Sequence, residues 1–166
     1  IEAALDTNVE RVLLVSTDKA EAPTTLYGAT KLCAERIFIA SNKYAGSREG
    51  IFSVMRLGNI AFSRGSVIPK WKALIAAGET TVPVTDPECT RYWITAAEAA
   101  KCVLETLSLP DGSYTALMPA FRVGDLAEAL DVKMEIIGLR PGERLHESGS
   151  ELARRMTVEE LRHHVG

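Results

Sequence analysis

A short apolar run that ends in polar residues, followed by a long helical pattern, constrains the fold of this chain most. The run Val12–Val15 has the length and composition of a buried strand, and the polar sequence Ser16–Lys19 follows it directly. After a loop that contains a proline, residues 24–45 have the pattern of a helix. A second apolar run, Ile51–Leu57, predicts another core strand. We therefore expect two core strands with a long helix between them along this stretch.

Tyr27 and Lys31 form the first candidate acid–base pair. They are four residues apart in the predicted helix, which places them on one face with their Cβ atoms about 6 Å apart. A lysine ammonium there favours the phenolate, so the pair could take a proton from a sugar hydroxyl while a nicotinamide accepts the hydride. The spacing alone is a weak signal, because such pairs occur by chance in many helices.

Asp18 and Lys19 form a second candidate pair, directly after the first predicted strand. Ligand sites in open α/β sheets form at the carboxyl ends of strands, which favours a functional interpretation. The alternative is an aspartate that caps a helix next to a lysine on the surface. The residues alone leave both interpretations open.

Both pairs lie in one longer segment that resembles a known family. The segment Ser16–Glu35, STDKAEAPTTLYGATKLCAE, resembles the extended short-chain dehydrogenase/reductase family. Within that family it is similar to the nucleotide-sugar 4,6-dehydratases that invert carbon 5 of UDP-N-acetylglucosamine, a group that includes capsule and flagellin-glycan biosynthesis proteins. Further matching segments are RLGN at 56–59 with SRGSVIP at 63–69, TDP at 85–87 with TRYW at 90–93, and RPGERLHE at 140–147. Together they extend the resemblance over nearly the whole chain up to Glu147.

The resemblance implies an α/β fold, namely the C-terminal half of an NAD(P)-binding Rossmann-like fold with a small substrate-binding domain. Residues 1–60 would form the second half of the Rossmann sheet and carry the Tyr/Lys helix. Residues 61–150 would form mainly the UDP-sugar domain, interleaved with the last sheet elements, and residues 151–166 a C-terminal helical tail, where we expect His163 and His164 to be solvated.

The resemblance also implies a role for each candidate catalytic residue. Tyr27, helped by Lys31, would deprotonate the hydroxyl on carbon 4 of the hexose, and Thr17 would hydrogen-bond the same oxygen. Lys19 would remove the proton on carbon 5, and Asp18 would protonate the hydroxyl that leaves carbon 6. The product would be a 4-keto-6-deoxy sugar nucleotide. The lysine after the aspartate indicates the inverting branch, since the retaining branch is expected to have a glutamate there.

Cofactor binding is expected at Tyr27, Lys31 and Leu57, with NAD or NADP as the cofactor of the complete enzyme. No GxxGxxG loop occurs in the chain, so binding of the dinucleotide by this chain alone is doubtful, and the choice between NAD and NADP stays open. We expect the chain to be a fragment of a longer product, a truncated reading frame or a short protein that has lost catalysis, and favour the first two.

Substrate binding is expected at a set of polar residues in the later motifs, because a diphosphate needs cations around it. These residues are Asn59, Arg64, Arg91, Arg140 and Glu143. Asn59 would contact the diphosphate or the sugar, the arginines would hold the diphosphate, and Glu143 would contact the uridine ribose. For each arginine the alternative is a surface ion pair. Leu57, where the family often has tyrosine, and Phe62, which replaces a small residue and could crowd the sugar pocket, depart from the family pattern.

Two other functions stay open. A UDP-sugar 4-epimerase of the same superfamily would need no elimination and hence no Asp18–Lys19 pair. A non-catalytic module would bind UDP without cofactor, or neither. In each case a half-sheet exposes a strand edge, so we expect a partner: a second copy of the chain or the N-terminal half.

Composition and motifs exclude several classes of protein. With 166 residues the chain has the length of one ordinary domain, and a net charge of -3 gives no basic patch for nucleic acid. The apolar runs are too short to span a membrane. No HExxH or CxxC occurs, so no metal site is expected. Three widely spaced cysteines indicate reduced thiols and a cytoplasmic protein.

Overall fold

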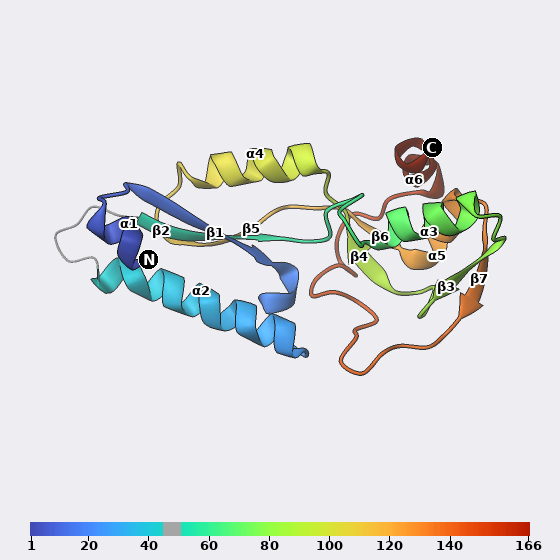
Figure 1. Cartoon of the computed structure of the whole chain (residues 1–166), viewed down its shortest axis with the longest axis horizontal. Helices are drawn as coiled ribbons and strands as arrows, with labels where there is room; N and C mark the ends of the chain where they lie inside the picture. The colour runs from blue at the N-terminus through green and yellow to red at the C-terminus, as the bar shows by residue number, and fades with distance from the viewer. Residues whose placement is uncertain (45–50) are drawn as a thin grey trace. The chain divides into compact units, whose positions relative to one another are not determined.

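The computed structural model describes residues 1–44 and 51–166, which form two compact units (Figure 1). The first unit contains Ile1–Gly58 and Ala96–Leu117, and the second contains Asn59–Thr95 and Met118–Gly166. The chain therefore enters the second unit after Gly58, returns to the first for one helix and one strand, and ends in the second. We describe each unit by itself.

The first unit is a parallel sheet with helices on both faces. Its strands β1 (Arg11–Thr17), β2 (Ile51–Leu57) and β5 (Gly112–Thr115) lie in the order β1-β2-β5. The helix α2 (Leu26–Tyr44) covers one face, and α4 (Ala96–Thr106) covers the other (Figure 1). This arrangement confirms the α/β class predicted from the sequence.

The order of the strands explains which side chains are buried. Phe52 and Val54 of the central strand β2 are fully buried, and Phe38 of α2 packs edge-on against Phe52 with ring centroids 5.3 Å apart. By contrast, β1 lies at the edge of the described sheet, and Val15 is 46% exposed. The apolar run that predicted a buried strand thus forms a strand at the edge of the described sheet.

The second unit combines three helices with two small sheets. Its elements in chain order are α3 (Val67–Ala76), β3 (Thr81–Val84), β4 (Thr90–Tyr92), β6 (Ala120–Arg122), α5 (Val123–Ala129), β7 (Lys133–Ile136) and α6 (Val158–Val165). The strands β3 and β7 pair in parallel, and β4 and β6 pair antiparallel. An apolar cluster joins α3, β3, β6, α5 and α6, and its buried side chains include Trp71, Trp93, Phe121 and Leu126.

One face of the helix at the end of the chain packs into this cluster, whereas His163 and His164, which were expected in a solvated tail, are exposed. Leu161 and Val165 of α6 are buried, because their spacing of four residues places both on one face of the helix. The ring of His164 lies 5.4 Å from that of Trp93, centroid to centroid. A capping box, in which Thr157 and Glu160 exchange side-chain and backbone hydrogen bonds, starts the helix.

Candidate functional site

The first group of candidate residues lies where β1 ends. Thr17 is the last residue of the strand, and Asp18–Ala20 (η1) form a single turn of 3-10 helix. The Thr17 hydroxyl donates to Oδ1 of Asp18 over 2.8 Å, and Nζ of Lys19 lies 3.3 Å from the same oxygen. The Asp18 side chain is 3% exposed and that of Lys19 34% exposed. The structure therefore places a hydroxyl and an amine around the buried carboxyl group of Asp18.

Helix α2 brings the second pair to the same unit. Tyr27 lies in its first turn and is 54% exposed, and Lys31 lies one turn later. Nζ of Lys31 donates to the carbonyl oxygen of Val15 over 3.3 Å, so this side chain reaches to the last part of β1. The side chain of Lys31 therefore points toward the strand that ends in Thr17.

Gly28 explains how closely α2 approaches the turn η1, and sequence analysis missed it. A Cβ atom at this position would lie 2.3 Å from the carbonyl oxygen of Lys19 and 2.9 Å from Cβ of Pro23. Only glycine fits at such a distance, since real Cβ atoms do not come this close to a backbone oxygen. The residue next to Tyr27 thus packs directly against the backbone of Lys19. The motif YGATK contains this signal, in the glycine that follows the tyrosine.

Glu35 and Arg56 form a buried ion pair that sequence analysis also missed. Glu35, one turn after Lys31, is 2% exposed, and it accepts hydrogen bonds from Nε and Nη2 of Arg56 at the end of β2. These hydrogen bonds raise the pKa of Arg56 above its ordinary value, although burial opposes the change. The pair links the helix that carries Tyr27 to the central strand.

Leu57, the third residue expected at the cofactor, lies beside Thr17 in the register of β1 and β2. Its side chain is 4% exposed, so it is packed into the core of the first unit. The structure thus places five catalytic candidates and Leu57 in one unit.

The second unit contains a cavity of about 690 Å³. Four predicted substrate residues line it, namely Asn59, Arg91, Arg140 and Glu143. Arg64 is exposed and is not among the lining residues. The walls are apolar side chains of α3 and the strands, such as Trp71 and Phe121. A cavity that combines apolar walls with polar and charged groups suits a ligand with a flat ring and a charged end.

Two polar atoms in residues that line this cavity have no hydrogen-bond partner within the described ranges. They are Oγ of Ser66, at the N-terminus of α3, and Nε1 of Trp93, whose side chain is 3% exposed. Buried polar groups in native proteins almost always have a partner. This cavity is therefore a stronger candidate for a ligand site than its shape alone indicates.

Arg91 has protein partners for its guanidinium group. Nη1 donates to the carbonyls of Thr90 and Leu145, and Nη2 donates to Oε1 of Glu143 over 3.0 Å and to the carbonyl of Arg144. Nε lies 3.6 Å from Oε1 of Glu147. The guanidinium thus ties strand β4 to the segment that contains Glu143 and Glu147.

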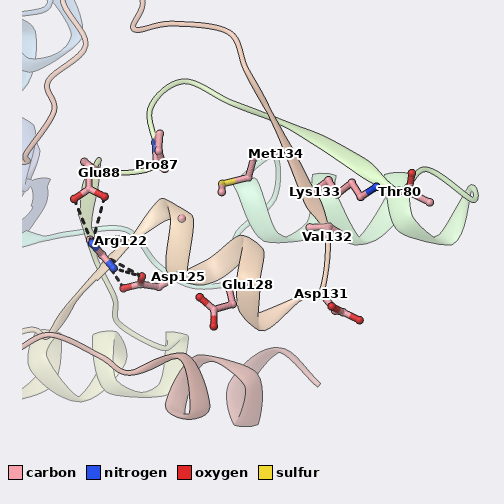
Figure 2. Close-up of a pocket in the computed structure, with 11 residues that line it drawn as sticks. Thr80, Pro87, Glu88, Arg122, Asp125, Glu128, Asp131, Val132, Lys133 and Met134 are labelled. Carbon is pink, nitrogen blue, oxygen red and sulfur yellow. Dashed lines mark hydrogen bonds and ion pairs between the residues drawn. The ribbon is translucent and has the colours of Figure 1, made fainter.

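A second hollow in the same unit, of about 610 Å³, has a different character (Figure 2). Arg122 donates to Asp125 of α5 and pairs with Glu88, which raises the pKa of Arg122 above its ordinary value, mainly through the hydrogen bonds to Asp125. Figure 2 shows Glu128 and Asp131 at the lower rim without an interaction drawn to them. No group of histidine, cysteine, aspartate or glutamate side chains in the described residues could hold a metal ion. Of the two hollows, the one that contains Arg91 is the candidate ligand cavity, because four predicted substrate residues line it.

The family follows from comparison with known proteins. Residues 1–164 match the family described as polysaccharide biosynthesis protein. The chain belongs to this family. Among proteins of known function it is similar to the UDP-N-acetylglucosamine 4,6-dehydratase (inverting) of Campylobacter jejuni subsp. jejuni serotype O:23/36 (strain 81-176), with 42% identity over 151 residues, which are 89% of this chain and 45% of the dehydratase. The resemblance found in the sequence is thereby confirmed.

Other proteins are similar along much the same stretch. The UDP-glucose 4-epimerase of Rickettsia canadensis (strain McKiel) is 32% identical over 156 residues, which are 89% of this chain and 46% of the epimerase. The X-ray structure of Pen from Bacillus thuringiensis superposes with a TM-score of 0.85 at 30% identity, over 99% of this chain and 64% of that one. The chain thus spans about half the length of the relatives it matches. In the part of the chain that the structure describes, no helix is long and apolar enough to cross a membrane.

Proposed function

We propose that this chain supplies the acid–base groups and the UDP-sugar site of an inverting UDP-N-acetylglucosamine 4,6-dehydratase. The observation that carries the proposal is the cluster of Thr17, Asp18 and Lys19, against which the first turn of the Tyr27 helix packs. The 42% identity to a dehydratase of that name supports the same reaction.

Tyr27 is proposed to take the proton from the hydroxyl on carbon 4. Its phenol is half exposed and can therefore meet a sugar, and Lys31 lies one turn later on the same helix. The hydroxyl of Thr17 would hydrogen-bond the same sugar oxygen. Oxidation of carbon 4 to a ketone makes the neighbouring proton on carbon 5 acidic.

Asp18 and Lys19 are proposed to carry out the elimination. Lys19 as the free amine takes the proton from carbon 5, the electron pair forms the double bond to carbon 6, and Asp18 as the acid protonates the departing hydroxyl. Water leaves, and the pair is left as ammonium and carboxylate. Their separation of 3.3 Å supports this assignment, because one proton passed along that hydrogen bond restores the starting forms.

NAD or NADP is the proposed cofactor; when bound, it would accept the hydride from carbon 4 and give it back to carbon 6. A proton would return to carbon 5, so the sugar would lose one water overall. The residues of the first unit fit such a group: Lys31 has three N–H donors, one of which goes to Val15, and ammonium donors suit ribose hydroxyls. Tyr27 lies beside it. Leu57 is proposed to contribute through its backbone, since its side chain is buried.

The diphosphate and uridine are proposed to bind in the cavity of the second unit. Arg140 and Asn59 line the cavity beside apolar walls, and Ser66 and Trp93 have polar atoms without partners in the described residues. Arg64, which is exposed, stays a candidate for the phosphates or for the sugar.

The edge of β1 is the proposed contact for a partner, either the N-terminal half of the family's enzymes or a second copy of the chain. Its outer backbone groups can extend the sheet, and Val15 is exposed. Analytical ultracentrifugation tests this, since a monodisperse monomer of the chain at micromolar concentration would contradict the second copy. We infer a cytoplasmic setting from the free thiols of the three cysteines.

The test is mass spectrometry of UDP-N-acetylglucosamine incubated with NAD⁺ or NADP⁺ and the polypeptide of the whole coding sequence, with the 166-residue chain tested alongside. A product that has lost one water is expected, and Lys19→Met or Tyr27→Phe should lower its rate by about 10²–10⁴-fold. An isomer of unchanged mass would instead indicate the 4-epimerase. Binding of UDP without any turnover would leave a non-catalytic module.

A further inference from the structure

Arg91 and Glu143 face each other in the cavity of the second unit, where a diphosphate would need a cation. Both residues line the cavity, and Nη2 of Arg91 lies 3.0 Å from Oε1 of Glu143. Their side chains are 12% and 25% exposed, so water screens this pair less than it would screen a surface pair.

Each N–H donor of the Arg91 guanidinium group faces an acceptor within the protein. Arginine has five N–H donors, and those of Arg91 are directed at three backbone carbonyls, at Glu143 and, at 3.6 Å, at Glu147. Of the residues that supply these acceptors, only Glu143 also lines the cavity; Thr90, Arg144, Leu145 and Glu147 are not among the lining residues. An anion that enters the cavity can therefore form a hydrogen bond with Arg91 chiefly by displacing the carboxylate of Glu143.

Glu143 is itself held in place by three donors. Its Oε1 accepts from Arg91 and, over 3.3 Å, from the hydroxyl of Thr85, and its Oε2 accepts from the backbone N–H of Arg140 over 3.2 Å. The carboxylate thus occupies a nest of donors of the kind that binds a phosphate oxygen.

We propose that Glu143 is an internal anion that competes with the diphosphate of the ligand for Arg91 and so weakens its binding. This inference rests on the proposed function, because it assumes that the cavity takes a nucleoside diphosphate. It assigns Glu143 a role opposite to that of a ribose ligand. A ribose ligand strengthens the binding of every uridine compound, whereas a competing anion weakens the binding of phosphate-bearing compounds alone.

The experiment is isothermal titration calorimetry of the 166-residue chain with UDP, uridine and inorganic pyrophosphate, in a buffer free of phosphate and sulfate. The variant is Glu143→Gln, which keeps the size of the side chain and an acceptor for Arg91 while removing the charge. Glu128→Gln on α5 is the matched control, because it makes the same charge change in the other hollow of the unit. Glu143→Asp keeps the charge and serves as a second variant.

Removal of the charge should tighten the binding of UDP and pyrophosphate by about tenfold at low salt, and the gain should shrink as the ionic strength rises. The affinity of the Glu143→Gln variant for uridine should not rise. Glu128→Gln and Glu143→Asp should stay within about twofold of the unchanged chain.

Two results would overturn the proposal and are distinguishable. If Glu143→Gln weakens UDP and uridine alike, or leaves UDP unchanged, Glu143 does not compete with phosphate, while UDP binding by the unchanged chain still supports the proposed function. If neither the unchanged chain nor any variant binds UDP or pyrophosphate, the proposed UDP site is wrong, and this inference with it.

Discussion

Glu35 and Arg56 join helix α2 to the central strand of the first unit through a buried ion pair, with Nη2 of Arg56 2.6 Å from Oε2 of Glu35. Glu35 lies one turn beyond Lys31, and Lys31 one turn beyond Tyr27. Because the pair fixes the rotation of α2 at its middle, it also determines which way the face with Tyr27 and Lys31 points. The pair is thus a structural support for the candidate acid–base groups.

Glu35→Ala should destabilise the first unit by about 3–5 kcal/mol, because it leaves the guanidinium of Arg56 buried without its partner. Hydrogen exchange of α2 and β2 peptides under increasing urea measures the change. Glu105→Gln is the matched control in the same unit, since its pair with Lys101 is exposed and 3.8 Å long, and it should cost less than about 0.5 kcal/mol. Equal losses in the two variants would show that the Glu35–Arg56 pair contributes no more than a surface pair.

Gly28→Ala should move the first turn of α2 away from the turn that contains Lys19. The new Cβ atom would lie 2.3 Å from a backbone oxygen, which cannot rotate away. We expect a net loss of about 1–3 kcal/mol in stability, although alanine favours a helix over glycine. Gly124→Ala is the control, because its Cβ would meet Pro87 at a milder 3.1 Å. Thermal unfolding followed by circular dichroism compares them, and a Gly28→Ala variant as stable as the unchanged chain would contradict the close packing.

The first unit was largely predictable because its signals are local. The apolar runs predicted both β1 and β2. The helical pattern of residues 24–45 predicted α2, whose observed bounds are Leu26–Tyr44. The family motifs gave Asn59, Arg91, Arg140 and Glu143 as substrate residues, and the structure places these four around one cavity. Whether they bind a substrate stays a prediction.

Interactions between distant segments were not predictable from the sequence. The pairing of Arg91 with Glu143 spans 52 residues, and no local pattern distinguishes it from a phosphate ligand that is free to bind. The strand β6, with three residues, is too short to give a period. The packing of α6 was missed because Leu161 and Val165 stand among charged residues, so that the sequence resembles a solvated helix.

The pKa of Glu160 should lie below its ordinary value, chiefly because the carboxylate accepts a hydrogen bond from the backbone of Thr157 and also one from Arg154. A carboxyl group whose pKa is lower in the folded state stabilises that state above its unfolded pKa, and this contribution is lost as the pH falls through the folded pKa. An NMR titration of the carboxyl group measures the value. Arg154→Ala should raise the pKa of Glu160 only part of the way, because the bond from Thr157 remains; a return to the ordinary value would make Arg154 the main cause.

Thr90→Val should destabilise the second unit by about 1–3 kcal/mol, because the buried hydroxyl of Ser150 and the half-buried ring of His146 each lose a hydrogen-bond partner. The Thr90 hydroxyl lies 2.6 Å from Oγ of Ser150, which is fully buried, and 2.9 Å from Nδ1 of His146. Both tryptophans of the chain belong to this unit, so their fluorescence reports its unfolding in urea. Valine matches threonine in size, so packing changes little and the loss reports the hydrogen bonds.

Ser150→Ala is the companion to Thr90→Val and separates the two bonds. It removes one partner of Thr90 but leaves His146, so the threonine hydroxyl stays satisfied and the loss should be smaller than for Thr90→Val. If the two variants lose the same stability, the contact with His146 contributes nothing and Thr90 acts through Ser150 alone. If neither loses stability, the hydroxyl network does not hold the segment after His146 against β4, and the apolar contacts of Met156 and Leu161 are sufficient to place it.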